Sequence, residues 1–225
     1  MNKKIAFTLA EVLITLGIIG VVAAITMPTI IQKQNEKATI TKLKKEYSVM
    51  SNALLNAISE YGDPEHWGTK SYTYKNDNGD DVENNFADID VITKYLKIVE
   101  DCGHEAKGCF AHRYKRLDDS QERDFENLSY YRKFILADGT LVAIQGYGEP
   151  GNGEIWIDIN GKNPPNIAGK DLFLFYLSNH KIGPYFQRKV SDNGYEASGW
   201  ILAFDNMDYL HCNDKLSWEG KHSCK

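Results

Sequence analysis

The sequence lacks the short motifs that mark several large enzyme classes. It contains no Gly-x-Ser-x-Gly, no P-loop and no His-Glu-x-x-His, which are the signatures of a hydrolase nucleophile, a phosphate-binding loop and a zinc protease. The six histidines are scattered along the chain rather than grouped. We therefore predict no catalytic residues, and we do not expect the protein to be an enzyme.

The chain also lacks an excess of basic residues. Its 26 Lys and Arg face 31 Asp and Glu, which gives a net charge of −5. Broad nucleic-acid binding requires a basic face. The one basic cluster, Arg113, Lys115 and Arg116, is interpreted as a solvated surface. The composition therefore argues against nucleic acid as a partner.

One long segment lacks charge altogether. No charged residue occurs from Val12 to Met27, while Lys3 and Lys4 precede the segment and Glu11 stands at its start. An apolar stretch of about twenty residues is long enough to cross a bilayer. Because basic residues favour the cytoplasmic side, we expect the N-terminus in the cytoplasm and the rest of the chain to be exported. A carboxylate inside such a span is costly and, by default, functional.

These first thirty residues resemble the prepilin signature of type IV pilins and type II secretion pseudopilins. The family has a Gly or Ala at the cleavage site, Phe as the first mature residue and Glu as the fifth, and Ala6, Phe7 and Glu11 match this pattern. Gly20 and Pro28 match the family's deeper Gly and Pro, thirteen and twenty-one residues after Phe7. Ala6 departs from the commoner Gly, so slower processing is expected.

The resemblance implies a structural filament subunit in the bacterial inner membrane. Prepilin peptidase would cut between Ala6 and Phe7 and methylate the Phe7 amine, and an inner-membrane assembly platform would add the subunit to others of its kind. In the resulting cell-surface or periplasmic filament, the Phe7 amine of one copy would neutralise Glu11 of its neighbour and so set the register. The stretch from Gly20 to Pro28 would lose helical structure on packing.

A conventional signal sequence is the main alternative. The small residues Val22, Ala23 and Ala24 resemble a signal-peptidase site, and the mature protein would then be a secreted or membrane-anchored enzyme or binding protein. The position of Glu11 inside the apolar region argues against this alternative.

The helix is predicted to continue beyond the apolar segment. Apolar residues recur at alternating spacings of three and four, which is typical of an amphipathic helix; they are Ile40, Leu43, Tyr47, Met50, Leu54, Ala57 and Tyr61. Gly62, Asp63 and Pro64 are a strong stop signal. A coiled coil is the alternative explanation of the stripe. We divide the chain into a leader (1–6), a transmembrane or filament-core half-helix (7–31), an amphipathic half-helix (32–61) and a globular head (62–225).

The head shows mostly strand signals. An Asp138-Gly139 pair between the apolar runs 128–136 and 140–145 predicts a hairpin. Further strands are expected at 154–159, 172–177 and 200–204, and a short helix at 89–99. We expect little regular structure in 62–87 and an exposed segment at 113–127. A helix followed by an antiparallel sheet is the α+β class, and a long helix packed on such a sheet is the pilin architecture by resemblance.

Four cysteines form two local pairs, Cys102 with Cys109 and Cys212 with Cys224. In an exported chain this pattern predicts two disulfides, and the second pair resembles the disulfide that closes the C-terminal loop of many pilins. Zinc bound by Cys102, His104, Cys109 and His112 is an alternative, although the spacing matches no standard zinc motif.

The segment from Asp158 to Asp171 resembles a stretch that recurs in pilin-like proteins. We interpret it as a turn stabilised by side-chain hydrogen bonds. Calcium held by Asp158, Asn160 and Asp171 is the alternative, although no complete EF-hand loop is present. No other cofactor is expected.

Overall fold

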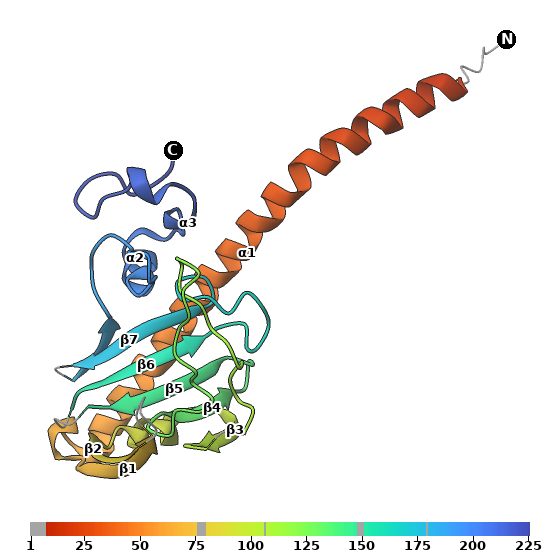
Figure 1. The fold of residues 1–225 in the computed structure, drawn as a ribbon. Helices are drawn as coiled ribbons and strands as arrows, with labels where there is room; N and C mark the ends of the chain where they lie inside the picture. Colours follow the sequence, from red (N-terminus) through yellow and green to blue (C-terminus); the bar gives the residue numbers. More distant parts are fainter. Residues whose placement is uncertain (1–7, 76–79, 106, 148–150, 179) are drawn as a thin grey trace. The chain divides into compact units, whose positions relative to one another are not determined.

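A computed structural model describes residues 8–75, 80–105, 107–147, 151–178 and 180–225 (Figure 1). The chain divides into two units, residues 1–38 and 39–225, and the first helix, α1 (Leu9–Tyr61), runs through both.

The first unit is the apolar part of α1. Its side chains from Leu9 to Ile31 are almost all exposed in the single chain. Within the described residues, α1 is the one helix long and apolar enough to cross a membrane. A helix that is apolar on every side needs lipid or other protein around it, as the sequence predicts for residues 7–31.

The second unit is built on a six-stranded antiparallel sheet in the order β3-β4-β5-β6-β7-β8. Sequential neighbours pair throughout, which is the simplest connectivity for an antiparallel sheet. The strands are β3 (Ile98–Gly103), β4 (Arg132–Leu136), β5 (Leu141–Gly146), β6 (Gly153–Asp158), β7 (Leu172–Ser178) and β8 (Lys181–Pro184). The long helix and this sheet make the protein an α+β, pilin-like fold, as the sequence predicts.

The C-terminal half of α1 packs on one face of the sheet, behind the strands in Figure 1. The stripe residues Leu43, Met50 and Leu54 are fully buried against this face, and Tyr47 stacks on Phe175 with ring centres 5.6 Å apart. The stripe therefore contacts the sheet and not a second helix of a coiled coil. Tyr61, the last residue assigned to the stripe, is 41% exposed and lies outside the core.

The opposite face of the sheet is covered by the segment 104–131. Side chains from alternate strand positions, among them Trp156 and Leu174, form a second core with Phe110, Tyr114 and Phe125. The expectation that 113–127 is exposed was therefore wrong. Its many charges hid a few large aromatic residues, and each buried aromatic contributes roughly 1.5–3 kcal/mol.

A second hairpin lies in the region where we expected little regular structure. Strands β1 (Thr69–Lys75) and β2 (Asp81–Ala87) pair in antiparallel register, after a short 3-10 helix, η1 (Pro64–His66). That expectation was wrong because the polar composition masked alternating Thr, Tyr, Val and Phe residues, which favour strands.

Two further assignments change. The expected helix at 89–99 is a 3-10 helix, η2 (Asp90–Tyr95), and Val99 already belongs to β3. The expected strand at 200–204 is the end of a helix, α2 (Ala197–Phe204). Trp200 lies on that helix, and its side chain is fully buried. Short apolar runs do not distinguish a buried helix from a strand. The chain ends with α3 (Tyr209–Cys212) and η3 (Asn213–Lys215).

Candidate functional site

The processing residues Ala6 and Phe7 lie outside the described residues, the first of which is Thr8. The backbone N–H and the hydroxyl of Thr8 donate to Oε2 of Glu11 at 2.8 and 2.7 Å, and the Glu11 N–H donates to the Thr8 hydroxyl at 3.3 Å. This reciprocal pattern is a capping box, which satisfies free N–H groups at the start of a helix. The spacing Thr8-x-x-Glu11 is its sequence signal, and our sequence reasoning missed it.

Gly20 and Pro28 both lie inside α1, which is helical through both residues. A Cβ atom built on Gly20 would meet no heavy atom within 4 Å. Crowding within the chain therefore gives no reason for glycine here, whereas a small residue allows close approach of a second helix in a membrane. The role of both residues in assembly stays a prediction.

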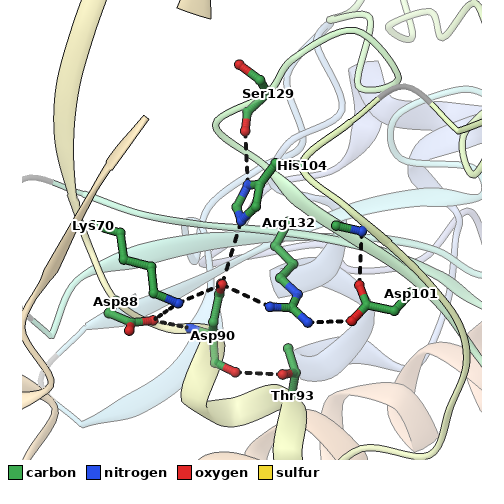
Figure 2. Close-up of polar contacts among 9 residues, drawn as sticks. Lys70, Asp88, Asp90, Thr93, Asp101, His104, Ser129 and Arg132 are labelled. Atoms are coloured by element: carbon green, nitrogen blue, oxygen red, sulfur yellow. Dashed lines mark hydrogen bonds and ion pairs between the residues drawn. The ribbon is translucent and has the colours of Figure 1, made fainter. Parts of the chain in front are cut away.

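A cluster of charged side chains in the head centres on Asp90, at the start of η2 (Figure 2). Its Oδ2 lies 3.1 Å from Lys70 Nζ, 3.2 Å from Arg132 Nη1 and 3.7 Å from His104 Nε2. Burial alone would raise the pKa of Asp90, but the hydrogen bond from His104 and the charges of Lys70 and Arg132 lower it to about 2. The carboxylate is therefore ionised at any physiological pH.

The Asp90 cluster connects elements far apart in sequence. Lys70 lies on β1 and Arg132 on β4, where it also contacts Asp101 of β3. Nδ1 of His104 donates to the carbonyl of Ser129, 2.9 Å away. Every charged group in Figure 2 contacts one of opposite sign or a backbone atom. This arrangement is suited to holding the β1–β2 hairpin, η2 and the sheet together. No sequence pattern indicates it, because its members lie far apart along the chain, from Lys70 to Arg132.

The two disulfides pair Cys102 with Cys109 and Cys212 with Cys224, which are the pairs expected from sequence. Cys102 and Cys109 are fully buried. Because zinc binds thiolates, this disulfide excludes the alternative zinc site with His104 and His112.

The segment 158–171 forms a turn around two buried carboxylates, Asp158 and Asp171. Asp158 accepts hydrogen bonds from the Tyr114 hydroxyl at 2.5 Å and from the Asn160 N–H at 3.1 Å. Asp171 accepts the N–H groups of Asn166 and Ile167 at 2.7 and 2.6 Å. Each carboxylate oxygen thus has a donor from the protein, as a structural turn requires. Burial, with the nearby charge of Asp171, raises the pKa of Asp158 to about 8.

A third charged cluster joins α1 to the β4–β5 turn within the second unit. Lys45 Nζ lies 2.5 Å from Oδ2 of Asp138 and 3.0 Å from Oε1 of Glu46. Glu46 is almost fully buried, and burial raises its pKa, as does the neighbouring Asp138. A groove of about 530 Å³ opens beside it between α1 and residues 136–138.

Sequence reasoning also missed the buried carboxylates on the outer face of the sheet. Glu154 of β6 is 2% exposed, pairs with Arg123 at 2.6 Å and accepts a hydrogen bond from Tyr147 at 2.8 Å. The carboxylate of Glu126 accepts the N–H groups of Gly108 and Phe110. A sequence pattern shows that such residues are charged but not that a covering loop buries them.

Two family models match the chain. The model described as "Family of unknown function (DUF6613)" matches residues 29–219, and the model described as "Prokaryotic N-terminal methylation motif" matches residues 1–27. No curated protein and no solved structure matches the chain.

Proposed function

Because the chain belongs to the family of unknown function DUF6613 and begins with the prokaryotic N-terminal methylation motif, we propose that it is a structural subunit of a type IV pilus-like or type II secretion filament. By that motif it is a type IV pilin-like or pseudopilin precursor. Its proposed activity is assembly and not catalysis.

The single carboxylate of the apolar part of the helix, Glu11, is the main support for this proposal. Glu11 receives two hydrogen bonds from Thr8, but Thr8 is neutral and leaves the negative charge uncompensated. The free amine of Phe7 on a neighbouring subunit would supply the missing positive charge. Losing one partner of a buried ion pair costs about 3–5 kcal/mol, so a subunit docked in the wrong register would be strongly disfavoured.

The same motif supports the proposed route to the filament. Prepilin peptidase would cut between Ala6 and Phe7 and methylate Phe7, and the apolar helix would hold the subunit in the inner membrane with the head outside the cytoplasm. Two disulfides in the head fit an exported location, because such bonds persist in oxidising compartments. The assembly platform would then draw the helix from the lipid bilayer into contact with other subunits.

Replacing Glu11 by Ala in the natural host tests the proposal. Glu219→Ala, at an exposed position of the head, is the matched control for loss of one carboxylate. We expect Glu11→Ala to accumulate in the membrane and to be depleted at least about tenfold from sheared filaments, and Glu219→Ala to assemble normally. Equal incorporation of both variants would contradict the proposal, and a soluble exported head would favour a conventional signal sequence.

A further inference from the structure

Three side chains with metal-binding atoms meet where α1 ends. Asp63 and Glu65 belong to the start of η1, and His180 lies in the turn between β7 and β8, 117 residues further along the chain. One ligand atom from each of the three lies within 4.8 Å of the other two. Nε2 of His180 is 2.6 Å from Oδ1 of Asp63.

We propose that Asp63, Glu65 and His180 bind a divalent transition-metal ion of the zinc class. One imidazole nitrogen and two carboxylate oxygens are a donor set that suits zinc and its neighbours better than magnesium or calcium, which prefer oxygen donors alone. Three protein ligands leave at least one coordination position for water, as in zinc sites that are not fully closed.

The side chains need only a small movement to fit such an ion. With bonds of about 2.0–2.1 Å, two tetrahedral ligand atoms lie about 3.3 Å apart. The Asp63 and His180 atoms must therefore separate by less than 1 Å. Both side chains are 42% exposed, so neither is fixed by close packing. Oδ1 of Asp63 also accepts the Glu65 N–H at 3.0 Å, which orients this carboxylate in the way that outer-shell contacts orient metal ligands.

An ordinary ion pair explains only part of the cluster. Asp63 and His180 form an exposed ion pair, and pairs of this kind contribute little to stability. Among the described residues, the carboxylate of Glu65 makes no hydrogen bond or ion pair, although it lies beside the other two groups. Two carboxylates beside one imidazole leave an excess of negative charge, which a divalent cation would compensate.

A bound ion would tie the β7–β8 turn to the segment that follows α1. Asp63 and Glu65 come directly after Gly62, which turns the chain with a positive φ of 77°. The ion would thus join the end of the helix to the edge of the sheet. Because the three ligands come together only in the folded head, a bound ion would raise thermal stability, and the gain would grow with the logarithm of ion concentration above the Kd.

Calorimetric titration of the full-length protein in detergent micelles with Zn²⁺, and separately with Ca²⁺, tests this site. We expect one equivalent of Zn²⁺ to bind in preference to Ca²⁺ near pH 7.5, because the site offers a nitrogen donor. His180→Asn and Glu65→Gln should each weaken binding by more than about tenfold, since even outer-shell losses cost about 10–100-fold. The exposed His112→Asn is the matched control and should bind like the wild type.

The design leaves Asp63 unchanged because it also caps η1. Equal metal-free melting temperatures would show that the two site variants fold. Absence of saturable Zn²⁺ binding, or unchanged binding in either His180→Asn or Glu65→Gln, would overturn the proposal. The result is independent of the filament proposal, because none of the three residues lies in the N-terminal motif.

Discussion

Arg132 of β4 holds Asp90 of η2 by an ion pair between Nη1 and Oδ2 at 3.2 Å. The same guanidinium contacts Asp101 of the neighbouring strand β3. Arg132 therefore links the 3-10 helix to two strands at the edge of the sheet. A planar guanidinium with several donors is suited to bridging two carboxylates in this way.

Replacing Asp90 by Asn should destabilise the head by about 2 kcal/mol near pH 7. This is the free energy that corresponds to lowering its pKa from 3.8 to about 2. Since the folded pKa lies below the unfolded value, the contribution is present above pH 4 and disappears as the pH falls through 2. Chemical denaturation at pH 7 and at pH 2.5 measures both effects.

The exposed Asp119→Asn variant is the control, because among the described residues the Asp119 carboxylate pairs with Lys115 alone, at the surface. It should lose less than about 1 kcal/mol at either pH. If Asp90→Asn were as stable as Asp119→Asn at pH 7, the Asp90 cluster would not hold the head together.

Asp158 should produce the opposite pH dependence. Its pKa in the folded chain is about 8, above the ordinary value of 3.8. The folded state therefore binds the extra proton between these values, and the contribution of Asp158 to stability falls as the pH rises from 4 to 8. As the pH rises through this range, the melting temperature should decline less in Asp158→Asn than in the wild type. An equal decline in both proteins would contradict the assignment.

Calcium provides a second test of the same turn. If the turn is purely structural, millimolar Ca²⁺ and EGTA should give the same melting temperature at pH 8. Calcium bound by Asp158, Asn160 and Asp171 would instead stabilise the ionised carboxylates and raise the melting temperature at that pH. A saturable rise that Asp171→Asn abolishes would replace the structural interpretation.

Removing the C-terminal disulfide should cost stability. Cys212 and Cys224 are separated by 12 residues, and closing a loop of this size is worth about 2.5–3 kcal/mol on the chain-entropy model. The double variant Cys212→Ser/Cys224→Ser should therefore unfold at lower denaturant concentration than the wild type. Dithiothreitol at a concentration that reduces this bond should lower the unfolding midpoint of the wild type toward that of the variant. A variant as stable as the oxidised wild type would refute the prediction.

The parts of the fold that sequence predicted are those with local, repeated signals. The stripe through Leu43, Met50 and Leu54 specifies one face of α1, and Asp138-Gly139 specifies the β4–β5 turn. The methylation motif is similarly local, because it lies within residues 1–27.

The parts that sequence missed depend on contacts between distant segments. Trp200 lies in an apolar run that fits a strand as well as a helix, and its burial decides the outcome. Asp90 becomes a partly buried charge only because Lys70, His104 and Arg132 converge on it. His180 and Asp63 meet for the same reason, since a turn and a helix end are adjacent only in the folded head.

The mass of the N-terminal peptide, measured on protein from the membrane fraction, tests whether the chain is processed as a filament subunit. A filament subunit should begin at Phe7 with one methyl group on its amine, which requires cleavage after Ala6. A chain that begins near Ile25, or an uncut chain that begins at Met1, would contradict the filament proposal.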